Sequence, residues 1–165
     1  MNNFSLSYGR LPVMPAILAF AFAFLFDFIP FPADSFFWLP KFSAMVLIFL
    51  ALYRPQTFGL LSAFIVGLLI DAGTATPLGS HALAYVCAVF LIQFPSYMKK
   101  LNTPVRQTIG VFMALLFIQI VLLFVHAVSR RQWVHMESMA AAVSGMLLWP
   151  LADKILKNLF FRFSR

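Results

Sequence analysis

Acidic and histidine side chains are the groups in this chain that could transfer protons or bind a metal. Four acids and three histidines belong to this set, namely Asp27, Asp34, Asp71, Glu137, His81, His126 and His135. No two of the histidines lie three or four residues apart, and no acid recurs with them at a fixed interval. The spacing matches no metal-ligand signature, so we expect neither a metal nor a cofactor.

The motifs of enzyme active sites are absent from the sequence. It has no glycine-rich phosphate loop, no nucleophile elbow and no HExxH zinc motif. Ser80 and His81 are adjacent, but they are better explained as the start of a helix than as a nucleophile and its base. The only cysteine, Cys87, lies inside an apolar run and has no partner for an internal disulfide. We therefore expect a non-enzymatic protein.

Asp71 ends an apolar run, where its carboxylate would face the negative end of its own helix dipole. The following loop, which is rich in Gly and Thr and contains Pro77, can turn back and bring the next helix close. Gly79, Ser80 and His81 would then offer free backbone N–H groups. We predict that Asp71 caps this next helix and locks the hairpin. Direct contact of the carboxylate with a ligand or partner is the alternative.

Small residues precede Asp71 at four-residue spacing, which places them on one face of a predicted helix. A stripe of small side chains lets another helix approach closely. That helix could belong to the same chain, as any bundle requires, or to a partner protein. The candidate residues for helix packing or partner contact are Pro55, Gly59, Ala63, Gly67, Asp71 and Gly79.

The composition predicts an integral membrane protein. Of 165 residues, 62% are hydrophobic, 17% are aromatic and only 10% are charged. A single soluble core of this size could not hide so much apolar surface. The formal net charge of +7 is explained by basic loops on one side of a membrane, so we expect no nucleic acid partner.

Apolar runs predict an all-α fold, a compact bundle of about six transmembrane helices in one domain spanning residues 1–165. The run at 108–128 is the clearest span. The second run either begins near Phe36 or is short, and the third is short as well, so the helix count is five or six. The runs lie near 13–29, 36–53, 57–70, 80–94, 108–128 and 138–151, and a basic cytoplasmic tail follows at 152–165.

The distribution of Lys and Arg predicts that both termini are cytoplasmic. If six helices span, alternate loops place nine of the 12 basic residues on one side, and only Lys41, Arg130 and Arg131 on the other. This orientation puts Asp27 and Asp71 on the outer side. Each basic residue of the tail near an anionic leaflet contributes roughly 1 kcal/mol of attraction. The expected membrane-surface anchors, with anionic lipid as partner, are Lys154, Lys157, Arg162 and Arg165.

One stretch resembles the signature of the rod shape-determining MreD family. Its residues are Pro55 and Gly59, then Gly67-Leu68-Leu69-Ile70-Asp71, then Leu78-Gly79 with His81-Ala82-Leu83, preceded by Trp38 and a short run ending at Tyr53. The size, the number of helices and the basic tail are also similar. Two features depart from the family: Arg54 replaces an aromatic or polar residue after the tyrosine, and the loop with Arg130 and Arg131 is unusually basic.

The resemblance implies a non-enzymatic scaffold of the bacterial cell-elongation machinery in the cytoplasmic (inner) membrane. Such a protein helps to determine cell shape and to organise peptidoglycan synthesis together with MreC. It also implies contacts with RodA and its class B penicillin-binding protein, and with MreB directly or indirectly.

The family's fold is similar to the membrane-embedded substrate-binding subunits of ECF-type vitamin transporters, which supplies the alternative function. Few polar residues lie within the runs, which favours the scaffold because a vitamin pocket must be polar.

Overall fold

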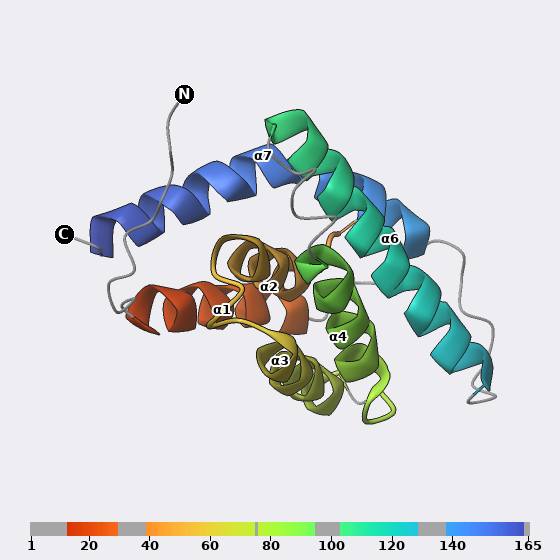
Figure 1. The fold of residues 1–165 in the computed structure, drawn as a ribbon. Coiled ribbons are helices and arrows are strands. Elements are labelled where there is room, and N and C mark those ends of the chain that lie inside the picture. Colours follow the sequence, from red (N-terminus) through yellow and green to blue (C-terminus); the bar gives the residue numbers. More distant parts are fainter. Residues whose placement is uncertain (1–12, 30–38, 75, 95–102, 129–137, 164–165) are drawn as a thin grey trace.

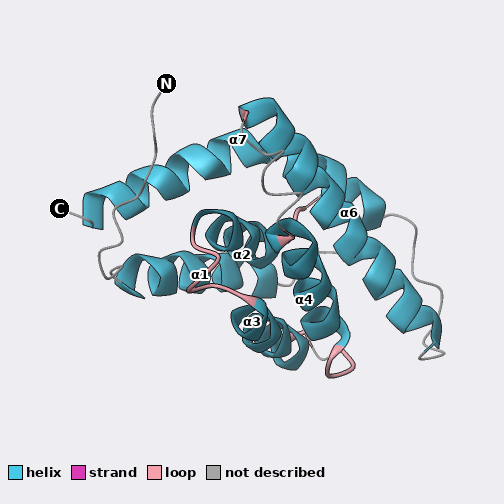
Figure 2. Cartoon of the chain, in the orientation of Figure 1, coloured by secondary structure: helices cyan, strands magenta, loops and turns pink. Residues whose placement is uncertain are grey.

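The computed structural model describes residues 13–29, 39–74, 76–94, 103–128 and 138–163. All regular structure in these ranges is helical, as Figure 2 shows, so the predicted all-α class is confirmed for the part of the chain described. The helices are α1 (Val13–Phe28), α2 (Phe42–Tyr53), α3 (Leu60–Gly73), α4 (Ser80–Gln93), α6 (Pro104–Val128) and α7 (Ser138–Phe163).

The start of α3 corrects the predicted stripe. We expected Pro55 and Gly59 on the same helix face as Gly67, but α2 ends at Tyr53 and α3 begins only at Leu60. Proline disfavours helical geometry in the residue before it, and Arg54 has φ −140° and ψ 60°. Four-residue spacing therefore continues across a turn that is not helical, and Gly59 occupies the N-cap position in extended geometry.

Three other helix boundaries differ by several residues from the predicted runs. The helix α7 continues through Pro150 to Phe163, so most of the stretch predicted as a tail is helical. Its residues after Pro150 are mostly good helix formers, and Leu156 is buried against the core. The helix α6 begins at Pro104, four residues before the predicted run, because proline suits the first turn of a helix. The helix α2 begins at Phe42 rather than near Phe36.

The helix α2 forms the centre of the packing, with nine of its 12 residues buried. In Figure 1 it lies among α1, α4 and α7, and it contacts all three. The helix α3 packs chiefly on α4, while α6 packs on α4 and α7. Large side chains that α2 and its neighbours bury completely or nearly so include Leu47, Ile48, Tyr85 and Trp149.

One described helix is long and apolar enough to cross a membrane, through its segment Pro104–Val125. Four others are apolar but shorter, namely Met14–Phe28, Phe42–Tyr53, Leu60–Gly73 and Ser80–Gln93. Large apolar side chains point outward from several helices, among them Leu25 on α1, Leu61 on α3 and Phe124 on α6. Exposed apolar faces of this extent are typical of surfaces that lie against lipid or another protein.

Candidate functional site

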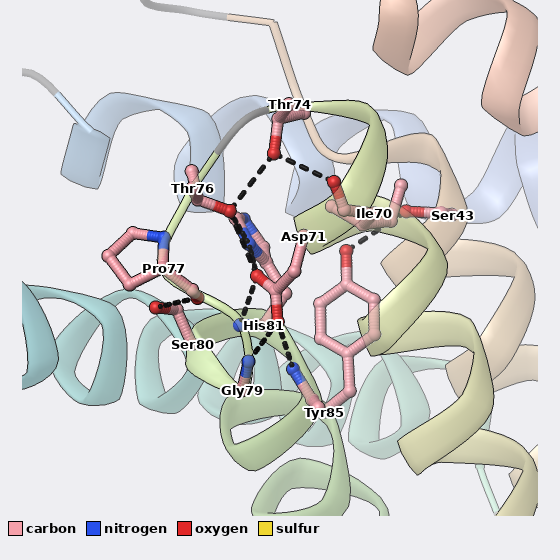
Figure 3. A network of polar contacts seen from close by, with 11 residues as sticks. Ser43, Ile70, Asp71, Thr74, Thr76, Pro77, Gly79, Ser80, His81 and Tyr85 are labelled. Carbon is pink, nitrogen blue, oxygen red and sulfur yellow. Dashed lines mark hydrogen bonds and ion pairs between the residues drawn. The ribbon is translucent and has the colours of Figure 1, made fainter.

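Asp71 lies in the last turn of α3 and caps the start of α4 (Figure 3). Its carboxylate accepts hydrogen bonds from the backbone N–H groups of Gly79 at 2.8 Å, His81 at 2.9 Å and Ala82 at 3.4 Å. The predicted cap is therefore present. Ser80 differs from the prediction, because its N–H donates to the carbonyl of Pro77 at 3.1 Å.

The loop between α3 and α4 is shaped to hold this carboxylate. Gly79 has φ +98°, a left-handed conformation that side chains disfavour, so glycine is the natural residue at this N-cap. Thr76 donates its hydroxyl hydrogen to Asp71 at 2.9 Å, and its oxygen lies 3.1 Å from that of Thr74. Thr74 in turn donates to the carbonyl of Ile70 at 2.7 Å. The loop is thus closed by short-range hydrogen bonds.

His81 pairs with Asp71 through its side chain as well. The Nδ1 atom lies 2.8 Å from Oδ1 of Asp71, so this nitrogen carries the proton of the contact. An acid beside an imidazole could serve a nucleophile. Ser80, the adjacent hydroxyl, instead donates to the carbonyl of Pro77 at 2.7 Å. The pair therefore holds the start of α4 and does not form a nucleophile with its base.

Asp27 repeats this arrangement in the first hairpin, which the sequence analysis missed. It lies in the last turn of α1 and accepts hydrogen bonds from the backbone N–H groups of Phe42 at 2.9 Å and Ser43 at 3.0 Å, the first residues of α2. Both acids lie at or near the end of an apolar run that a proline-containing loop follows. That shared pattern was the signal that could have revealed the second cap.

A buried hydrogen bond connects the two caps. The Ser43 hydroxyl lies 2.9 Å from that of Tyr85, and both residues are fully buried. The Tyr85 ring also meets the His81 ring edge to face, with centroids 6.0 Å apart. We name these residues the two-cap cluster: Asp27, Ser43, Asp71, His81 and Tyr85. It places the end of α1 and the end of α3 on the same side of the bundle.

The stripe of small residues packs within the chain. Ala63 is fully buried. A Cβ atom added to Gly67 would lie only 2.3 Å from the Cα of Ala82, so α3 and α4 are in backbone contact there. The intramolecular alternative is thus what the structure shows for Gly67, since α4 already occupies this face.

Pro55 and Gly59 lie at the far end of the same hairpin. The Gln93 side-chain amide, at the end of α4, donates to the carbonyl of Phe58 at 2.8 Å and lies 3.4 Å from that of Pro55. A Cβ atom on Gly59 would meet only ordinary contacts, at 3.7 Å and beyond. Close approach therefore requires glycine at position 67 and not at position 59.

A second set of polar side chains joins α2, α6 and α7 at the opposite end from the two-cap cluster. We name it the Tyr53 group: Tyr53, Gln107, Asp153 and Lys157. Tyr53 donates to Asp153 at 3.0 Å, and its hydroxyl lies 3.3 Å from the Gln107 side-chain oxygen. Lys157 donates to Asp153 at 2.6 Å and lies 4.9 Å from the Tyr53 ring centre. Burial lowers the pKa of Lys157, but the hydrogen bonds to Asp153 and Tyr53 outweigh it and raise that pKa above its ordinary value.

The predicted membrane anchors are thus not equivalent. Lys157 is engaged within the chain, whereas Lys154 and Arg162 are exposed on α7. Arg165 lies outside the described residues, as do Asp34, His135 and Glu137 of the acidic and histidine set. In the described parts of the chain, no group of three or more His, Cys, Asp and Glu side chains could hold a metal ion.

Comparisons with known proteins identify the family. A family model described as rod shape-determining protein MreD matches residues 10–159, which is most of the chain. No curated protein and no solved structure matches it. The matched range includes both caps, the Gly67 contact and the Tyr53 group. The chain therefore belongs to the MreD family of rod shape-determining membrane proteins.

Proposed function

We propose that this protein is a non-enzymatic scaffold of the cell-elongation machinery in the bacterial cytoplasmic membrane. In this role it helps to organise peptidoglycan synthesis together with MreC. The observation that carries the proposal is membership of a family that determines rod shape. The proposed further partners are RodA with its class B penicillin-binding protein, and MreB directly or indirectly.

The positions of the two polar groups support a multi-pass arrangement. The two-cap cluster gathers the ends of α1 and α3 with the starts of α2 and α4. The end of α2 and the beginning of α6 meet at the Tyr53 group. Arg54 and Arg106 belong to this second end, and the positive-inside rule makes it cytoplasmic.

The short helices fit this arrangement because their polar ends are satisfied inside the protein. The helices α2, α3 and α4 have 12, 14 and 14 residues. At 1.5 Å per residue they reach only about 18 to 21 Å, which is less than the roughly 30 Å of a hydrocarbon core. Backbone groups at such depth must bond within the protein, and both caps provide such bonds for the starts of α2 and α4.

The hydrogen bonds that Asp71 and Asp27 accept favour a scaffold over a catalyst. The Asp71 carboxylate accepts hydrogen bonds from three backbone N–H groups, the Thr76 hydroxyl and the His81 ring. The Asp27 carboxylate accepts hydrogen bonds from two backbone N–H groups. Carboxylates bonded in this way hold helix starts in place, so the cluster makes a rigid frame.

The transporter alternative receives no support from the cavity between α1, α2 and α7. A vitamin site needs several polar groups that fix the ligand's orientation. Every residue that lines this cavity is apolar.

Affinity purification from native membranes tests the proposal. The tagged full chain is isolated in mild detergent, and mass spectrometry identifies what accompanies it. Recovery of MreC with RodA or its synthase partner is the expected result. Recovery of ATPase subunits with a coupling membrane protein would contradict the scaffold and favour the transporter.

A further inference from the structure

An apolar groove runs between α1, α2 and α7 and has a volume of about 520 Å³. Its floor consists of small or buried side chains, including Ala19, Ala23, Met45 and Leu156. Its rim consists of larger side chains that remain exposed, such as Phe22, Leu151 and Ile155. The groove is thus open to the surroundings of the protein along its length, with no polar side chain in its lining.

The length of the groove matches the depth of one leaflet of a bilayer. Along α7 its lining extends from Leu148 to Leu159, a distance of about 17 Å at 1.5 Å per residue. One leaflet of a bilayer is about 15 Å deep, half of a hydrocarbon core of roughly 30 Å. One acyl chain of a lipid in that leaflet therefore matches the groove in length and in its lack of polar groups.

One end of the groove lies beside a positive charge. The helices α1 and α7 run in opposite directions in Figure 1, so the first turn of α1 and the last turns of α7 lie at the same end. Arg162 follows Leu159 by three residues and Ile155 by seven, which places it on the groove face of α7. It is exposed. At the other end, the Phe26 and Phe42 rings lie 5.3 Å apart.

We propose that this groove binds one acyl chain of an anionic phospholipid from the cytoplasmic leaflet, with the phosphate beside Arg162. An empty apolar groove would forfeit dispersion contacts along three helices, and a hydrocarbon chain restores them without burying a polar group. The cation selects a negative headgroup. This is one defined site, in contrast to the general attraction of a basic surface.

Lys154 provides the matched control for Arg162. Both are exposed cations on α7, but Lys154 lies eight residues before Arg162. At 3.6 residues per turn it is rotated by about 140° around the helix from Leu159, whereas Arg162 is rotated by only about 20° from Ile155. Lys157 is unsuitable because Asp153 holds it.

Native mass spectrometry of the purified full chain, with phosphatidylglycerol or phosphatidylcholine added, tests the site. We expect one phosphatidylglycerol per protein to survive activation that removes phosphatidylcholine. Arg162→Gln should lower this retention by about fivefold, and Lys154→Gln should leave it unchanged.

Filling the floor of the groove is a second test. Ala23→Phe should abolish retention of the lipid, and an unchanged melting temperature in lipid-free detergent would show that this variant folds. If Ala23→Phe melts lower, Ala19→Leu, which fills the same floor, replaces it. Equal retention of both lipids, or equal effects of the two charge substitutions, would overturn the proposal.

A photo-crosslinking residue at Phe22 tests the occupant in native membranes. Labelling of phospholipid is expected, whereas a protein adduct would assign the groove to a partner and overturn the proposal. The site does not depend on the scaffold function. Loss of lipid retention with intact recovery of MreC would refute only the lipid site, and the reverse result would refute only the scaffold.

Discussion

Replacement of Asp71 is expected to separate a structural lock from a charge that serves a partner. Asp71→Leu removes the acceptor for the N–H groups of Gly79 and His81. Asp71 itself is only 1% exposed, so water cannot readily replace its carboxylate as the acceptor. Each buried donor left without a partner costs about 1 to 3 kcal/mol. We therefore expect Asp71→Leu to lower the free energy of unfolding by about 3 to 5 kcal/mol.

Asp71→Asn keeps one acceptor oxygen and should cost less. An amide with its oxygen in the Oδ1 position still accepts from His81 and Thr76, but its NH₂ group then faces the Gly79 N–H. One lost hydrogen bond at this site should cost about 1 to 2 kcal/mol. Unfolding of both variants by a denaturing detergent, followed by circular dichroism, measures the difference.

Two results would refute this reasoning. Equal destabilisation by Asn and Leu would show that hydrogen-bond acceptance is not what Asp71 contributes. Wild-type stability in Asp71→Asn together with lost function would mean that the charge itself contacts a partner or ligand.

Three further predictions concern the contacts around this lock, each measured by the same unfolding titration. Asp27→Ala should cost about 1 to 3 kcal/mol because it uncaps α2, and an unchanged stability would contradict the second cap. Gly67→Ala should cost at least about 2 kcal/mol because its Cβ would lie 2.3 Å from the α4 backbone, whereas Gly59→Ala should cost under about 1 kcal/mol; similar costs would argue against the close approach. Tyr85→Phe and Ser43→Ala should each cost about 1 to 3 kcal/mol, and the double variant less than the sum; additive effects would mean that their hydroxyls are not coupled.

Local rules were sufficient to predict the Asp71 cap. The carboxylate and the N–H groups that it accepts from lie within 11 residues of each other, on either side of a loop whose glycine and proline indicate a reversal. The all-α class also followed from apolar content and run length. In each case the determinant was close in sequence or was a property of the whole composition.

Contacts between distant helices could not be predicted in this way. Asp27 bonds across 15 residues to Phe42, and Ser43 meets Tyr85 across 42 residues, so both depend on how the helices pack. The stripe misled the prediction for a different reason, because Pro55 keeps helical spacing while lying in a turn. The length of α7 was underestimated because the apolar run stops at Leu151 and basic residues follow it.

The central claim, that this protein is a shape-determining scaffold, is tested most directly by its depletion from its own cells. The account predicts that depleted cells lose control of rod shape and become round, that wild-type protein and Asp71→Asn restore rods, and that Asp71→Leu does not. Cells that keep their shape during depletion while their uptake of a vitamin falls would contradict the claim.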